Sequence, residues 1–288
     1  MERALILRGA LAGAVGGLLA FVFARIFAEP QISAAINYES GRDAAQDALD
    51  KAAGQAVPAM GPDIFSRTVQ ANVGIGVGMV FFGVAMGLLF AVTYTICLGR
   101  VGGVRARTLA LLVAGGGLLS MYVVPFLKYP ANPPAIGHED TIRSRSVLYL
   151  TMTLAAVLLL IGAVLLGRWL QARLGTWNAA LAAGAAYVVA VGIVMALLPS
   201  FGELAANVHT FGRHATETPL PLKDAQGRIV YPGFPADTLA TFRIYSLLAQ
   251  VILWGAIGLV FAPMAERVLT PPSAPEPARR DTAPASLR

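Results

Sequence analysis

Residues 73–98 read VGIGVGMVFFGVAMGLLFAVTYTICL and contain no charged side chain. A transmembrane α-helix needs about 20 apolar residues to cross the hydrocarbon core of a bilayer, and this stretch is long enough. A helix also satisfies its own backbone hydrogen bonds in lipid. The stretch therefore predicts a membrane-spanning helix, and it decides the fold class as an all-α membrane protein.

Five further apolar runs of similar character occur along the chain. They cover residues 5–27, 109–126, 147–166, 179–198 and 244–264. Hydrophobic residues make up 56% of the sequence and charged residues only 13%, which is about half the charged share of a soluble domain. We therefore expect a bundle of about six transmembrane helices over residues 1–269, with long outer loops.

The two ends of the chain need separate interpretation. The first run could be a cleaved signal peptide, but it is long and passes into Glu29 and Pro30 without a clear small-residue cleavage site. This favours a retained first helix. Residues 270–288, TPPSAPEPARRDTAPASLR, are polar and rich in proline and alanine, a composition typical of a disordered tail.

Arginine placement predicts the orientation of the helices. Arg100, Arg105 and Arg107 follow the second run, Arg168 and Arg173 follow the fourth, and neither of these short loops contains an acidic residue. Lysine and arginine accumulate in cytoplasmic loops of membrane proteins. We expect both termini and the tail in the cytoplasm, and a multi-pass protein of the inner (plasma) membrane.

Small residues recur at intervals of four in two of the runs. The glycines concerned are Gly9, Gly13 and Gly17 in the first run, and Gly74, Gly78, Gly83 and Gly87 in the second. Such rows let helix backbones approach closely. Simple packing within the bundle explains them; a close-packed wall along a permeation path is the alternative.

All three histidines of the chain fall on the predicted outer side: His138, His209 and His214. Imidazole is the commonest side-chain ligand of Co²⁺, Ni²⁺, Cu²⁺ and Zn²⁺. Glu139 adds an oxygen donor beside His138, and a turn at Gly212 would let the other two histidines converge. The candidate metal ligands are His138, Glu139, His209 and His214, unless they are simply solvated loop residues.

Other classes of function find no support in the sequence. There is no glycine-rich nucleotide loop, GxSxG or HExxH motif, so we predict neither an enzyme nor a permanently bound cofactor. The net charge of +6 comes from short loops in which basic residues do not interleave with aromatic ones. We therefore expect the lipid bilayer, and no nucleic acid, as the chain's surroundings.

Three stretches give the chain a recognisable pattern: FAEPQISAAINYE (residues 27–39), VVPFLKYPANPPAIGHEDTIRSRSVLYL (123–150) and FPADTLATFRIYSLLAQVILWGAIGL (234–259). With them the chain resembles the CbtA family, described as probable cobalt transporter subunits. The resemblance implies an integral membrane subunit of a cobalt uptake system linked to cobalamin synthesis. It also implies a small one-span, histidine-bearing partner, CbtB.

Two questions stay open at this level. Nickel and zinc accept the same imidazole and carboxylate ligands as cobalt, so the residues themselves do not select the transported ion. A non-transporting membrane scaffold that binds partners through its outer loops is the alternative function.

In the strip KYPANPPAIGHED (residues 128–140), the prolines predict a rigid, non-helical structural segment. His138 and its acidic neighbours predict the first contact with a metal.

Overall fold

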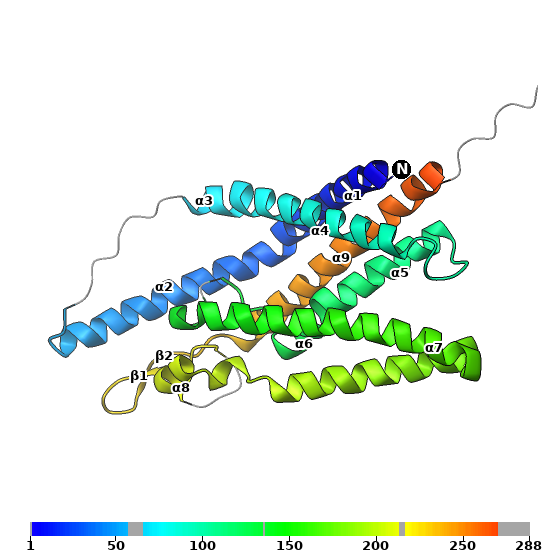
Figure 1. Cartoon of the computed structure of the whole chain (residues 1–288). Coiled ribbons are helices and arrows are strands. Elements are labelled where there is room, and N and C mark those ends of the chain that lie inside the picture. The colour runs from blue at the N-terminus through cyan, green and yellow to red at the C-terminus, as the bar shows by residue number, and fades with distance from the viewer. Residues whose placement is uncertain (1, 57–65, 135, 213–216, 270–288) are drawn as a thin grey trace, which may run out of the picture.

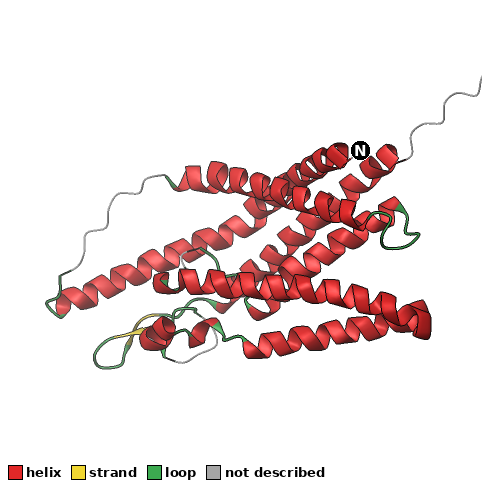
Figure 2. Cartoon of the chain, viewed as in Figure 1, coloured by secondary structure: helices red, strands yellow, loops and turns green. Residues whose placement is uncertain are grey.

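The computed structural model describes residues 2–56, 66–134, 136–212 and 217–269. The expected disordered tail and His214 lie outside these ranges. The chain is built almost entirely of helices, as Figure 2 shows, with one short two-stranded hairpin among the described residues.

Five helical segments are long and apolar enough to cross a membrane. They are α1 (Glu2–Phe23) continued by η1 (Ala24–Ala28) and α2 (Glu29–Ala52); α3 (Arg67–Val69), η2 (Gln70–Gly74) and α4 (Ile75–Cys97); α5 (Ala106–Leu118), η3 (Leu119–Val123) and α6 (Val124–Lys128); η4 (Glu139–Thr141), α7 (Ile142–Leu197) and η5 (Phe201–Glu203); and α9 (Ala236–Leu269). The prediction of an all-helical membrane fold is confirmed.

Helix α7 contains both the fourth and the fifth apolar run, because it folds back on itself at Gly175. That residue has φ 72° and ψ 169°, a left-handed backbone that glycine adopts without a Cβ penalty. A Cβ on Gly167 would lie 3.3 Å from the Cβ of Ala183, whereas a straight helix would separate these residues by about 24 Å. Figure 1 shows the two arms running antiparallel.

The core of the bundle lies between α1, α4, α5 and α9. Helix α1 packs against α4 on one side and α9 on another, and α9 also packs against α5. The rings of Phe90 and Tyr94 from α4 meet Phe261 from α9 edge to face, each with centroids 4.9 Å apart. Aromatic pairs prefer this geometry, since the positive ring edge faces the negative ring face.

The seam between α1 and α4 is formed by facing glycines. A Cβ on Gly13 would overlap the carbonyl oxygen of Gly83, and a Cβ on Gly87 would overlap that of Gly9. Backbones this close are possible only without side chains, as the predicted small-residue rows require. Gly74 and Gly78 of the same rows face open space or nearly so and take no part in the seam.

Helix α2 runs through Gly41 without a break and extends the axis of α1 through η1. Gly41 makes a close contact, since a Cβ there would overlap the hydroxyl of Tyr231 from β2 (Ile229–Tyr231). Its partner strand, β1 (Leu222–Lys223), completes the hairpin.

Candidate functional site

The strip 128–140 joins several helices at one end of the bundle. Burial raises the pKa of the Tyr129 hydroxyl, so this group stays protonated and donates to the carbonyl oxygen of Pro199 at 2.8 Å. The Tyr129 ring stacks on Phe201, with centroids 4.4 Å apart. Ile136 packs against Ala35 and Tyr38 of α2. These contacts give the strip a structural role.

Helix α9 holds the middle of the same strip. The Arg243 guanidinium donates from Nε to the carbonyl oxygen of Ala131 at 3.2 Å and from Nη2 to Oδ1 of Asn132 at 2.9 Å. We call the strip, together with the described residues between 199 and 235, the cap. It includes α8 (Ala205–Phe211) and the β-hairpin.

His138 lies within the cap, where it begins the short helix η4. Its Nδ1 accepts from the backbone N–H of Asp140 at 3.3 Å, and its Nε2 lies 3.1 Å from Oγ1 of Thr210 in α8. The Asp140 carboxylate is 3.8 Å from Nδ1. The imidazole is thus held in one orientation at the surface, with an acidic residue beside it.

Of the other three predicted ligands, the structure describes Glu139 and His209. Glu139 and His209 are both exposed, and His214 lies outside the described residues. Within the described ranges, no group of three or more histidine, cysteine, aspartate or glutamate side chains is placed to hold a metal ion. The assignment of His138, Glu139, His209 and His214 as ligands therefore stays a prediction.

Behind His138 lies a buried polar cluster centred on Glu217, which is 1% exposed. Its Oε1 is 2.6 Å from the Thr141 hydroxyl and accepts from Nδ2 of Asn207 at 2.6 Å. Its Oε2 lies 3.1 Å from Nη1 of Arg145. The Arg145 guanidinium also packs against Gly137, where a Cβ would lie 2.6 Å from Nη1. The carboxylate is therefore both charge-paired and hydrogen-bonded.

Sequence reasoning missed this cluster. Glu217 stands in a polar loop, and a charged loop residue is exposed by default. Its partners Thr141, Arg145 and Asn207 are 76, 72 and 10 residues away in the chain, with no recognisable spacing. Only the packing of the cap brings them together.

A second buried carboxylate, Glu29, lies where α1 passes into α2. It pairs with Arg67 of α3, and the Ser33 hydroxyl donates to it at 3.3 Å. One turn earlier, Nε of Arg25 donates to Oδ1 of Asn72 at 2.8 Å. The Arg25–Asn72 bond joins the π-helical segments η1 and η2, and the Glu29–Arg67 pair joins α2 to α3 beside them.

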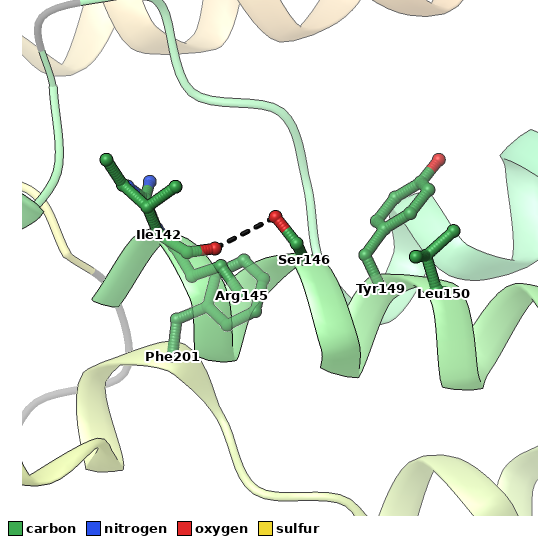
Figure 3. A pocket seen from close by; sticks show the side chains of 6 residues that line it. All are labelled: Ile142, Arg145, Ser146, Tyr149, Leu150 and Phe201. Atoms are coloured by element: carbon green, nitrogen blue, oxygen red, sulfur yellow. Dashed lines mark hydrogen bonds between the residues drawn. The ribbon is translucent and has the colours of Figure 1, made fainter. Parts of the chain in front are cut away.

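An open groove of about 450 Å³ lies at the start of α7, and Figure 3 shows the side chains that line it. Its lining residues are Ile142, Arg145, Ser146, Tyr149, Leu150 and Phe201. The Ser146 hydroxyl donates to the carbonyl oxygen of Ile142 at 2.9 Å, so this polar group is already used within the helix. The groove is mainly apolar and offers no carboxylate or imidazole ligand.

The chain was compared with known protein families, curated proteins and solved structures. One family model, described as "Probable cobalt transporter subunit (CbtA)", matches residues 2–266. No curated protein and no solved structure matches the chain. The matched family is one of transporter subunits rather than of enzymes. Because the match covers nearly the whole chain, the protein belongs to the CbtA family of probable cobalt transporter subunits.

Proposed function

We propose that this chain is the multi-pass subunit of a cobalt uptake system in the plasma membrane. The family match over residues 2–266 carries the proposal, and the five long apolar helices support it. Cobalt is the cargo in this proposal, not a resident cofactor. Nickel and zinc remain competing cargoes, because they accept the same nitrogen and oxygen donors.

The two arms of α7 each cross the membrane in this proposal, which gives six crossings with both termini in the cytoplasm. Nη1 of Arg168, near the α7 turn, donates to the carbonyl oxygen of Arg100 at 2.6 Å, so the two arginine-bearing loops meet at one end of the bundle. Figure 1 places the N-terminus and the end of α9 toward that end and α8 toward the other. The arginines support a cytoplasmic position for the first end.

Thiol labelling tests this topology in a variant whose only native cysteine, Cys97, is replaced by alanine. Ala44→Cys, in α2, should react with a membrane-impermeant maleimide in intact cells. Thr176→Cys, beside the α7 turn, should react only after lysis, because the turn faces the cytoplasm. Labelling of Thr176→Cys in intact cells would reject the proposed orientation.

The cap is the proposed site of first contact with the ion. His138 and Glu139 lie at its surface, with His209 on the neighbouring helix α8, and His214 follows α8 in the sequence. Because the described part of the cap holds no group of three metal-binding side chains, binding of the ion needs further ligands. A small one-span, histidine-bearing CbtB-like subunit would supply them. This partner is part of the proposal because a subunit implies an assembly.

Uptake of radioactive ⁵⁷Co²⁺ tests the function in cells that carry the partner gene. Cells with the chain should accumulate cobalt several-fold faster than cells without it. Separate alanine substitutions of His138, His209 and His214 should each lower uptake at limiting cobalt, since loss of one ligand weakens capture. Equal uptake with and without the chain would disprove transport; equal uptake by the three variants would disprove only the ligand assignment.

A non-transporting scaffold is the second candidate. The absence of a three-donor cluster among the described residues favours it. Equilibrium dialysis of the purified protein against Co²⁺ separates the two functions. A scaffold shows no stoichiometric binding, whereas a capture subunit retains about one ion per chain or per complex with its partner.

A further inference from the structure

We propose that Glu217 is a positioning residue for the outer capture site. Together with Arg145 and Thr141 it fixes the backbone of His138, and through Asn207 it fixes the helix that contacts the imidazole. The inference rests on the proposed function, because it gives Glu217 a role in presenting a metal-capturing histidine.

Two chains of contacts lead from the carboxylate to the backbone of His138. Oγ1 of Thr141 lies 2.6 Å from Oε1 of Glu217 and 2.7 Å from the carbonyl oxygen of His138. Nη1 of Arg145 is 3.1 Å from Oε2 of Glu217, while its Nη2 donates to the same carbonyl at 3.4 Å. Both neighbours of Glu217 therefore also contact the backbone of the candidate ligand.

A third chain leads to the imidazole ring. Asn207 of α8 is fully buried, and its Nδ2 donates to Oε1 of Glu217 and to the carbonyl oxygen of Phe201. Thr210 stands three residues later on α8, and residues three apart lie on the same face of a helix. Its hydroxyl is the group 3.1 Å from Nε2 of His138. One buried carboxylate thus orients both the backbone of His138 and the contact to its ring.

The energetics of a buried ion pair do not by themselves explain the cluster. Removing a carboxylate from water is costly, and replacing a whole buried pair by apolar residues is often neutral or stabilising, whereas removing one partner alone is destabilising. The burial of Glu217 to 1% exposure is therefore weak evidence for a purely stabilising role, and the tests below separate positioning from stability. Groups that orient a metal ligand typically change metal affinity by about 10- to 100-fold when they are altered.

The first test needs no metal. Diethyl pyrocarbonate modifies accessible imidazoles, and peptide mass spectrometry reports the rate at each histidine of the purified chain. Glu217→Gln keeps the side-chain shape but removes the charge that holds Arg145. We expect the modification rate of His138 to rise several-fold, while His209, already exposed, keeps its rate.

Thr141 supplies a complementary pair of variants in case Glu217→Gln lowers the yield of folded protein. Thr141→Val removes the hydroxyl that lies between Glu217 and His138, whereas Thr141→Ser retains it. The valine variant should expose His138, and the serine variant should behave like the original chain. Asp224→Asn is the control, because the Asp224 carboxylate accepts from Gln226 and Arg228 within its own turn.

The second test measures Co²⁺ affinity by equilibrium dialysis. Glu217→Gln and Thr141→Val should each weaken binding by about 10-fold, with Asp224→Asn unchanged. An unaltered His138 modification rate in folded Glu217→Gln and Thr141→Val overturns the positioning role, whatever cobalt does. If His138 becomes reactive but the original chain binds and transports no cobalt, the proposed function fails while the structural coupling stands.

Discussion

Replacing Gly83 by leucine should prevent stable packing of the bundle. A Cβ at this position would overlap the carbonyl oxygen of Gly13 and approach the Cα and N of Gly17 to 2.8 and 2.9 Å. These are backbone atoms of α1, so no side-chain rotation can relieve the overlap. Overpacking of a tight core lowers the free energy of unfolding by about 1–3 kcal/mol and occasionally more. We expect the loss of stability in Gly83→Leu to lie at or above the upper end of this range.

The matched control is Gly78→Leu on the same helix. Gly78 is exposed, and nothing lies within 4 Å of a Cβ built there. A leucine at this position faces lipid and should leave the thermal midpoint unchanged or slightly raised, because leucine is a better helix former than glycine. The measurement is thermal unfolding of the purified protein in detergent, supported by the yield of folded protein from membranes.

The alanine pair makes this comparison sharper, because alanine adds only the Cβ. Gly83→Ala should lower the midpoint and Gly78→Ala should not. Equal midpoints for the two alanine variants would show that α1 and α4 are not in backbone contact. The glycine seam would then have no role in packing.

The seam also shows which parts of the fold the sequence could predict. Glycine spacing and apolar length depend on neighbouring residues, so the rows in α1 and α4 and the positions of the spans follow from the sequence. Which glycines meet depends on helix rotation, and Gly78 therefore looked equivalent to Gly83. The close contact of Gly41 with Tyr231 could not be predicted for a related reason: the two residues are 190 positions apart in the chain, so the contact leaves no local signal.

The candidate site was less accessible to sequence reasoning. The chain has only three histidines, so residue type alone was enough to select His138 as a candidate metal ligand. Glu217 looked like an ordinary loop acid, and its burial depends on three elements that meet only in the folded cap. The non-helical backbone of residues 129–134 was predicted correctly, because proline restricts the backbone locally.

Replacing Tyr129 by alanine should release the cap from the bundle. Tyr129 is 2% exposed, stacks on Phe201 and donates to the carbonyl oxygen of Pro199. Removing a buried aromatic ring costs about 3–5 kcal/mol. Because the ring joins the end of α6 to the segment after α7, we expect this loss to appear mainly as local opening of the cap.

Tyr129→Phe separates the ring from the hydroxyl. It keeps the stacking and loses one hydrogen bond to the carbonyl oxygen of Pro199, which costs about 1 kcal/mol. Hydrogen–deuterium exchange, followed by mass spectrometry, should show fast exchange over residues 200–208 in Tyr129→Ala and much slower exchange in Tyr129→Phe. This stretch contains the hydrogen-bonded amides of Glu203, Leu204 and Val208. The core segments around Phe90 and Phe261 should exchange alike in both variants.

The same two variants connect the cap to capture of the ion. His138 lies nine residues beyond Tyr129 on the strip. Asn207 on α8 donates to the carbonyl oxygen of Phe201, and the ring of the same Phe201 stacks on Tyr129. Opening the cap therefore disturbs both the strip that carries His138 and helix α8, which contacts its imidazole. Tyr129→Ala should lower cobalt uptake at limiting concentrations far more than Tyr129→Phe, when the two variants are present in the membrane at equal amounts. Both variants could take up cobalt at the original rate although the cap amides of Tyr129→Ala exchange fast. Cobalt uptake would then not depend on an ordered cap, and capture must begin elsewhere on the chain or on its partner.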